Sequence, residues 1–313
     1  GKVWEVRAWG EMFANSGLAS STGKQPSWRQ VFAEVPQGAS KSCGATVRTQ
    51  RPATKAALIT AIGTSNHNGT NSLAYIDTSG VTNMSSLFEN KKTFNGTISC
   101  WDVSAVTGDA KSHSGSAIKG MQAMFNGAVA FNQDIGGWDT GKVVSMVSMF
   151  LQATAFNNGG SDSIQDWNTA KVQGMDYMFQ DASAFDQPLN WDVSSVTLMT
   201  EMFSRARAFN QNIGGWDVSK VLKMEGMFEG ASKFNQNIGS WNVGSVTTMA
   251  AMFNGATAFN QDLSDWESTL SSTLKNTKPT SIFASSGMAC SGSTDEKNKA
   301  KAKWPSSWQS SCS

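Results

Sequence analysis

The side chains that could perform acid–base or nucleophilic chemistry are few in this chain. His67 and His113 are its two histidines, and both lie in loops rich in Gly, Ser and Asn, without a serine or cysteine nucleophile motif beside them. Glu201 and Glu225 occupy nearly equivalent positions in two copies of a repeat, on its polar side and without a partner in a predicted pocket. We therefore expect no catalytic residue, no cofactor and no enzymatic activity.

Two rows of polar residues recur at fixed positions of that repeat. A carboxylate or amide follows the first residue of each copy, at Asp77, Asp102, Asp139, Asn168, Asp192, Asp217 and Asn242. Such a row could chelate Ca2+, but its two asparagines show that charge is not required, and carboxylates about 5 Å apart would repel without a cation. We favour hydrogen bonds to turn backbone, and no metal site. The second row is predicted to bond to the backbone of adjacent copies and comprises Asn95, Asn132, Asn157, Asn210, Asn235 and Asn260.

Cysteines and glycosylation motifs bear on the compartment. The cysteines flank the repeats or lie in the first copies, at Cys43, Cys100, Cys290 and Cys312. They fit no metal-site spacing, so disulfides in an oxidising compartment are favoured. Of three possible connectivities we prefer Cys290 with Cys312, which share a tail, and hence Cys43 with Cys100. Asn68, Asn83 and Asn95 begin Asn-X-Ser/Thr motifs, although chance alone supplies such motifs here.

Charge and hydropathy exclude two classes of partner. The 25 Lys and Arg against 24 Asp and Glu leave a net charge of +1, without the clustered cations that nucleic acid requires. No apolar run approaches the roughly 20 residues that span a bilayer, so a membrane-spanning chain is not expected. No signal peptide is visible, and the chain starts at Gly1 as a processed or truncated product would.

The elements that position these residues come from one repeated stretch. The sequence WDVSSVTLMTEMFSRARAFNQNIGG begins at Trp191 and recurs, with changes, at Trp216 and Trp241. The full series begins at Ile76, Trp101, Trp138, Trp167, Trp191, Trp216 and Trp241, and Trp266 opens a truncated copy. Units this short cannot close a core alone and must complete it with their neighbours.

The apolar spacing within one copy predicts its secondary structure. Met199, Met202, Phe203, Ala206 and Phe209 follow one stripe of a helix. The next Trp and Val lie two apart, as in a short strand. The predicted fold class is therefore an α/β solenoid similar to leucine-rich repeats, with about seven strand–turn–helix units. Its core is predicted from Met199, Met202, Phe203, Phe209 and the tryptophans Trp101, Trp138, Trp167, Trp191, Trp216, Trp241 and Trp266, with methionine as a core residue rather than a metal ligand.

The repeats divide the chain into four parts. Residues 1–53 form an aromatic-rich segment that we expect to pack on the repeats or on a partner chain. Residues 54–75 supply a capping helix and a loop, residues 76–266 the repeats, and residues 267–313 a C-terminal cap that contains Cys290 and Cys312.

The motif W-D/N-V-S-x-V-x-x-M-x-x-M-F-x-x-A-x-x-F-N-Q-x-I resembles the repeat of BspA-like surface proteins, a family related to leucine-rich repeats. The resemblance covers residues 76 to about 266 and implies an extracellular, right-handed solenoid used in adhesion or surface assembly. It departs from the pattern at Ile76, where Trp is expected, and at Asp186, where Asn is expected.

Two functions of different classes remain open. The first is a structural or adhesive protein of the cell surface that associates with itself or with other surface proteins through its repeats and its aromatic-rich ends. Filaments or a surface layer would be its products. The second is a module that recognises a peptide or glycan along the sheet face.

Overall fold

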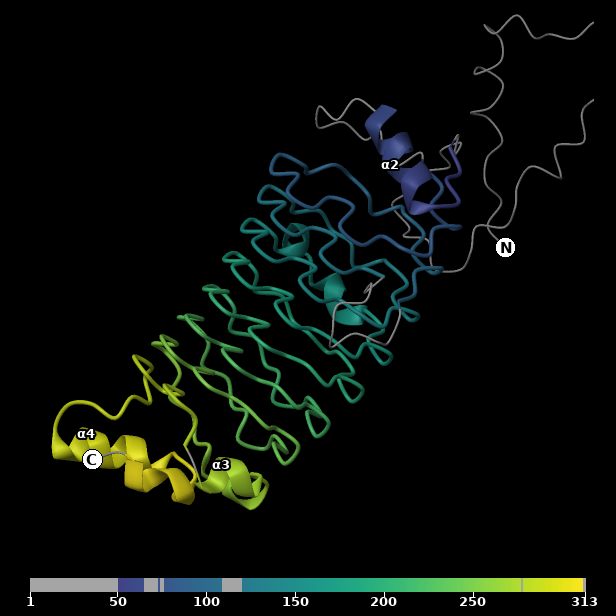
Figure 1. Cartoon of the computed structure of the whole chain (residues 1–313). Coiled ribbons are helices and arrows are strands. Elements are labelled where there is room, and N and C mark those ends of the chain that lie inside the picture. Colours follow the sequence, from purple (N-terminus) through teal and green to yellow (C-terminus); the bar gives the residue numbers. More distant parts are fainter. Residues whose placement is uncertain (1–49, 65–72, 74–75, 109–119, 277, 312–313) are drawn as a thin grey trace, which may run out of the picture. The chain divides into compact units, whose positions relative to one another are not determined.

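The structure is a computed structural model that describes residues 50–64, 73, 76–108, 120–276 and 278–311 (Figure 1). The α-helices are short and stand at the two ends of the described chain: α2 (Lys55–Thr64), α3 (Ser272–Asn276) and α4 (Thr294–Ala302). Short 3-10 helices occur at η4 (Asn158–Gly160), η5 (Asp162–Asp166), η6 (Ser264–Ser268) and η7 (Ser306–Ser311). The repeats themselves are built from turns joined by irregular segments.

The predicted α/β solenoid of strand–turn–helix units is wrong. Among the described residues there is no β-strand and no sheet, and no helix occupies the apolar stripe of a repeat. What stands in place of a sheet is a series of isolated parallel bridges, each one residue wide. They join Ser145 to Gly174, Gly174 to Leu198, Leu198 to Lys223 and Lys223 to Thr248.

Left-handed residues explain why the apolar stripe is not helical. The Met202 N–H donates to the Met199 carbonyl at 3.3 Å, and the Ala206 N–H to the Phe203 carbonyl at 3.0 Å, so these bonds close four-residue β-turns. Between them, Glu201 has a φ of 50° and Arg205 a φ of 57°. L-residues pay about 1–2 kcal/mol for this conformation, and it cannot continue an α-helix. Apolar residues three apart therefore face the core from successive turns.

The amide groups that a helix would have used bind the next repeat instead. The N–H groups of Met199, Glu201, Phe203 and Arg205 all donate to carbonyls of the following copy, at 2.6–3.0 Å. The same pattern recurs between neighbouring repeats from Met84 onward. We call each repeat a coil, and we call the stretch equivalent to residues 199–206, in which alternate N–H groups donate to the next coil, the turn segment. Within these segments alternate N–H groups donate to the next coil, and the N–H groups between them close turns of their own coil. Figure 1 shows the coils lying side by side in sequence order.

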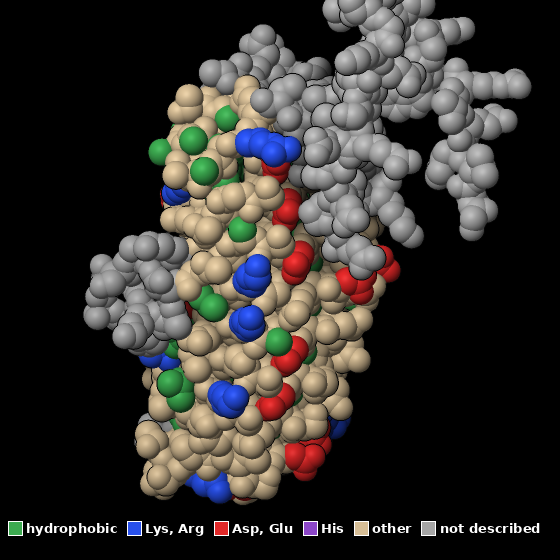
Figure 2. Space-filling model, turned by 90° about the vertical axis from the view of Figure 1, so that its right-hand side faces the viewer, with side chains coloured by type: hydrophobic (Ala, Val, Ile, Leu, Met, Phe, Trp, Pro, Cys, Tyr) green, Lys and Arg blue, Asp and Glu red, His purple; other side chains and the backbone are tan. Residues whose placement is uncertain are grey.

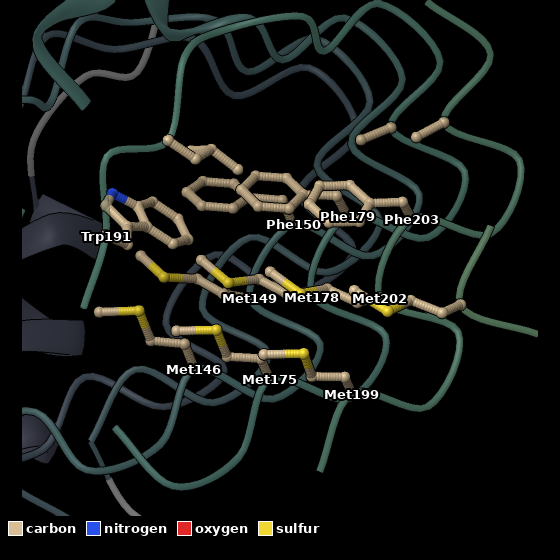
Figure 3. Close-up of a cluster of buried hydrophobic side chains, with 14 of the residues drawn as sticks. Met146, Met149, Phe150, Met175, Met178, Phe179, Trp191, Met199, Met202 and Phe203 are labelled. Atoms are coloured by element: carbon tan, nitrogen blue, oxygen red, sulfur yellow. The ribbon is translucent and has the colours of Figure 1, made fainter. Parts of the chain in front are cut away.

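Aromatic rings and methionines fill the interior in rows. Phe179 stacks on Phe150 at a centroid distance of 5.5 Å and on Phe203 at 5.6 Å. Figure 3 shows these phenyl rings beside two rows of methionine side chains from the same coils. The core positions Met199, Met202, Phe203 and Phe209 are fully buried. The result is one continuous interior in place of a separate core for each copy.

The tryptophans form a hydrogen-bonded column along that interior. Each tryptophan side chain in the column is at most 7% exposed. The column comprises Trp101, Trp138, Trp167, Trp191, Trp216, Trp241 and Trp266. The Nε1–H of Trp191 donates to the Ile164 carbonyl at 2.9 Å, and every other indole in the column makes the corresponding bond to the preceding coil. Because the indole N–H is paired, full burial of the ring leaves no donor unsatisfied.

The coils continue beyond residue 266, where the sequence analysis places their end. The N–H groups of Ala251, Phe253 and Gly255 donate to carbonyls of Thr280, Ile282 and Ala284 at 2.7–2.9 Å. Residues 279–286 thus form one more turn segment. A cap follows it, in which the Trp304 ring lies 5.0 Å from that of Phe283. At the other end, α2 buries Leu58 in the same core.

Glycine at a left-handed position offers a test of the turn segment. Gly226 has a φ of 56°, and a Cβ there would lie 2.9 Å from Glu201 Cγ. We expect Gly226→Ala to lower the free energy of unfolding by about 1–2 kcal/mol, as measured by chemical denaturation. Gly215→Ala is the control, because Gly215 has no positive φ and its Cβ would meet no atom within 4 Å. Equal effects of the two substitutions would contradict the assignment.

Candidate functional site: polar ladders and an acidic cluster

The carboxylates and amides that follow the first residue of each coil accept hydrogen bonds from the backbone of the same turn. Each Oδ1 accepts the backbone N–H two residues later, at 2.9–3.3 Å, as the sequence predicts. In Asp192 and Asp217 the serine hydroxyl and N–H that donate to the carboxylate lower its pKa. Among the described residues, no three His, Cys, Asp or Glu side chains are grouped to hold a metal ion.

The asparagine row forms a ladder between coils, which confirms the predicted backbone bonding. The Asn210 Oδ1 accepts the Asn235 N–H at 2.9 Å and the Gln236 Nε2–H at 3.0 Å. Asp186 serves equally well in this row because only an acceptor oxygen is needed. The ladder ends at Asn260, whose Oδ1 accepts a hydrogen bond from Lys303 Nζ at 2.7 Å. These amides are therefore committed to holding coils together.

An acidic cluster, which sequence reasoning missed, lies around Glu201. Glu201 and Glu225 stand in neighbouring coils, where the Glu201 N–H donates to the Glu225 carbonyl at 2.8 Å. Burial raises the pKa of Glu201, and the charges of Glu229, Asp181 and Glu225 raise it further against the opposing effect of Arg205. Arg205 itself makes two hydrogen bonds to Asp181, at 2.7 and 3.0 Å. The coil register gathers these charges, because positions one repeat apart become neighbours.

Tyr177 belongs to the same cluster. Burial raises the pKa of its phenol, and the nearby carboxylates Glu201, Asp176 and Glu225 raise it further. Figure 2 shows one face of the molecule, on which acidic side chains follow one another along the coils beside lysines and arginines. The arrangement is an electronegative surface with its own arginine.

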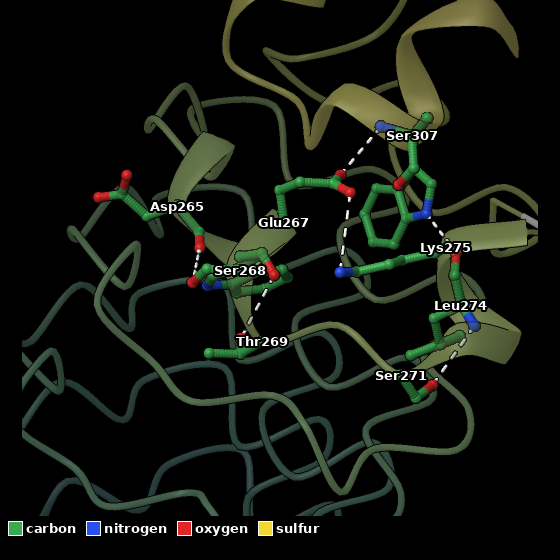
Figure 4. Close-up of polar contacts among 10 residues, drawn as sticks. Asp265, Glu267, Ser268, Thr269, Ser271, Leu274, Lys275 and Ser307 are labelled. Atoms are coloured by element: carbon green, nitrogen blue, oxygen red, sulfur yellow. Dashed lines mark hydrogen bonds and ion pairs between the residues drawn. The ribbon is translucent and has the colours of Figure 1, made fainter.

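The C-terminal cap is tied to the last coil by Glu267 (Figure 4). Its carboxylate accepts the Ser307 N–H at 2.9 Å and lies 3.9 Å from Lys275 Nζ, and so links η6 to η7 and α3. The Ser307 N–H is the main cause of the lowered pKa of Glu267. Lys303 and Glu267 together hold the tail against the repeats.

The remaining predicted sites are described only in part. Cys100 and Cys290 are disulfide-bonded, whereas Cys43 and Cys312 lie outside the described residues, so the preferred pairing stays a prediction. Asn95 is exposed, and its Oδ1 accepts the Asn132 N–H at 2.9 Å. Asn83 is half-buried and accepts the Ser85 N–H at 3.0 Å. His67, His113, Asn68 and the segment 1–49 also lie outside the described residues.

Comparison with known proteins gives one family. The family described as "Mycoplasma protein of unknown function, DUF285" matches residues 59–158, 108–190 and 189–286. The last match ends at the additional turn segment found in the structure. No curated protein and no solved structure matches the chain. In the described part of the chain, the helices are all too short or too polar to cross a membrane.

The asparagine ladder is tested by comparing two substitutions at one residue. Asn210→Leu removes the acceptor for two donors of the next coil, and we expect a loss of about 1 kcal/mol in the free energy of unfolding. Asn210→Asp keeps an acceptor oxygen, as Asp186 does in the preceding coil, and should fold with nearly unchanged stability. Denaturant titration at pH 7 measures both. If the two variants were equally destabilised, side-chain acceptance would not be the role of this row.

The acidic cluster makes stability depend on pH in a predictable direction. The pKa of Glu201 in the folded state is raised above its ordinary value of 4.5. The contribution of Glu201 to the free energy of unfolding is therefore present below pH 4.5 and is lost as pH rises through the folded-state pKa. Glu201→Gln should therefore stabilise the protein at pH 7, by less than about 1 kcal/mol for so accessible a group, and the gain should vanish below pH 4.5.

Glu267 provides the matched control of opposite sign. The pKa of Glu267 is lowered in the folded state, so its contribution to the free energy of unfolding is present above the ordinary value of 4.5. That contribution is lost as pH falls through the folded-state pKa. Glu267→Gln should destabilise the protein at pH 7, and the difference from the wild type should shrink in acid. Thermal unfolding from pH 3 to pH 8 compares the variants, and a Glu201→Gln variant less stable than wild type at pH 7 would refute the argument.

Proposed function

We propose that this chain, which belongs to the family described as "Mycoplasma protein of unknown function, DUF285", is a non-enzymatic protein of the cell surface with a structural or adhesive role. The observation that carries the proposal is the use of its polar side chains. In coil after coil, carboxylates and amides are bonded to backbone within the stack and so serve to extend a regular body. A body of this kind presents the same positions again and again, which suits multivalent contact with a surface or with further copies.

The cysteines support an extracellular location. Cys100 and Cys290 are disulfide-bonded, and disulfides persist in oxidising compartments. Cys100 lies in an early coil and Cys290 lies after the last turn segment. We extend the proposal to membership of the BspA-like surface proteins, whose repeat the motif at Trp191 resembles.

The burial of the C-terminal aromatic residues limits which surfaces could mediate self-association. Trp304 and Trp308 are fully buried in their own cap, so they are not available to a neighbouring molecule. We therefore assign self-association to the exposed sides of the coils and to the aromatic-rich sequence of residues 1–53. The recognition of a peptide or glycan was expected on a sheet face, and the described residues contain no sheet to provide one.

Imaging and sedimentation test the proposal on the full chain. At concentrations from about 1 to 100 µM, we expect analytical ultracentrifugation to show concentration-dependent assemblies, and electron microscopy to show filaments or sheets rather than isolated particles. Antibodies raised against the chain should label intact cells of the source organism without permeabilisation. A chain that stays monomeric at every concentration and captures a soluble peptide or glycan would favour recognition instead. Labelling only after permeabilisation would exclude the surface role.

A further inference from the structure

One side of the coils carries two rows of opposite charge. A carboxylate follows the first residue of several coils, and a lysine stands three positions after it, so that each kind of charge recurs at one place along the stack. The carboxylate row consists of Asp102, Asp139, Asp192 and Asp217, and the lysine row of Lys142, Lys171 and Lys220. Figure 2 shows basic side chains in a row beside acidic ones. We call these two rows and the strip between them the charged face.

The strip between the rows is made of small residues. Its central position is Gly, Ala or Ser in every coil, at Ser79, Ser104, Gly141, Ala170, Ser194, Ser219 and Gly244. Hydrogen bonds hold the coils in register here, because Thr169 Oγ1 donates to the Asp192 carbonyl at 2.8 Å and Ser245 Oγ to the Ser219 carbonyl at 2.6 Å. No large side chain therefore stands between the rows, and a second flat surface can approach them closely.

The carboxylates are held in place before any partner binds. Oδ1 of Asp192 and Oδ1 of Asp217 each accept the N–H group two residues later at 3.0 Å. Such a carboxylate loses less side-chain entropy on forming an ion pair than a freely rotating one does. Within the described chain, no charge of either row takes part in an ion pair. Both rows are thus available to a partner.

The first coil shows how a cation binds to a carboxylate at this position. Asp77 is the equivalent residue, and its Oδ1 accepts the Ser79 N–H at 3.1 Å. Its Oδ2 lies 3.2 Å from Arg51 Nε, which comes from the chain before the first coil. The turn and the ion pair therefore use different oxygens of one carboxylate. The exposed carboxylates of Asp192 and Asp217 can divide their oxygens in the same way.

Charge complementarity selects a second copy of the chain in one orientation. When two charged faces meet with their stack axes parallel, a two-fold axis along the strip places the lysine row of each copy opposite the carboxylate row of the other. When the stack axes are antiparallel, each row meets its own kind, and like charges opposed across an interface are unfavourable. The parallel arrangement also closes on itself, as the interface of a symmetric dimer must.

We propose that the charged face is the interface of a homodimer, in which two copies lie side by side with parallel stack axes and equivalent coils opposite each other. Lys220 then pairs with the partner's Asp217 and Lys142 with the partner's Asp139, and the two-fold axis makes each pair occur twice. The inference rests on the self-association proposed above and specifies the face and the orientation that produce it. Because exposed ion pairs contribute about 0.2–1 kcal/mol each, the dimer should be weak and sensitive to salt.

Charge reversal and mixing test the pairing on the full chain. Lys220→Glu and Asp217→Lys each place like charges opposite one another twice, so each should raise the dissociation constant of the dimer about tenfold in sedimentation equilibrium. An equal mixture of the two variants restores opposite charges at both contacts and should dimerise about as tightly as the wild type, whereas misfolding of either variant would not be repaired by mixing. Lys233→Glu is the matched control, because Lys233 is exposed and lies outside the charged face.

Cross-linking tests the orientation. Ala170→Cys and Ser219→Cys each place a thiol on the strip, two coils apart. With a short bismaleimide, each variant should cross-link to itself, and a mixture should give few mixed products. An antiparallel dimer centred between these coils would instead give mixed products. The wild-type chain controls for reaction of the native cysteines.

The outcomes separate this inference from the function proposed above. Self-association that neither charge reversal weakens, or cross-links that form between the two cysteine variants in place of self cross-links, would refute the charged face as the interface and leave assembly through other surfaces standing. A chain that stays monomeric up to about 100 µM would refute both.

Discussion

The backbone hydrogen bonds that run from each turn segment to the following coil are the constraint on which this structure depends. A repeat of about 25 residues loses roughly 1–2 kcal/mol of conformational free energy for each residue that it orders, more than its own apolar side chains recover. The bonds from Met199, Glu201 and Phe203 to the next coil supply what one copy lacks. They also fix the register in which phenyl, indole and thioether groups meet their counterparts. The stack is therefore cooperative between neighbours, and each coil is stable only in contact with others.

The same constraint explains both what the sequence predicts and what it does not. The copies can be aligned on Trp191, Trp216 and Trp241, so the repeat period and the positions of its polar ladders follow from residue spacing. The hydrogen bonds of Asp192 and Asn210 follow from the habit of short polar side chains to bind nearby backbone. None of this requires knowledge of the secondary structure, because it depends only on which positions recur.

The helix prediction failed because apolar steps of three suit two backbones. An α-helix and a chain of four-residue β-turns both bring Met199, Met202 and Phe203 to one face. Glycine would distinguish them, and it does occur at the left-handed positions of the next copy, Gly226 and Gly230. Elsewhere these positions hold ordinary residues such as Glu201, whose conformation is imposed by the neighbouring coils rather than by its own preference. The final turn segment is hidden for a related reason, because Pro279 and Ile282 replace the methionines of the motif.

The alignment of neighbouring coils decides which side chains come together on the surface of this fold. The sequence of one copy alone does not show these neighbours. The acidic cluster exists because Asp181, Glu201 and Glu225 occupy turn segments one coil apart, although they are separated by 20 or more residues in the chain. The bond from Met84 to Gly120 crosses the long insertion and still follows the pattern of the uninterrupted junctions. Insertions of different length thus lie outside the turn segments. At the left-handed positions, different amino acids occur in different coils while the backbone conformation stays the same. A protein built in this way can alter the charge of a face coil by coil and keep its interior constant.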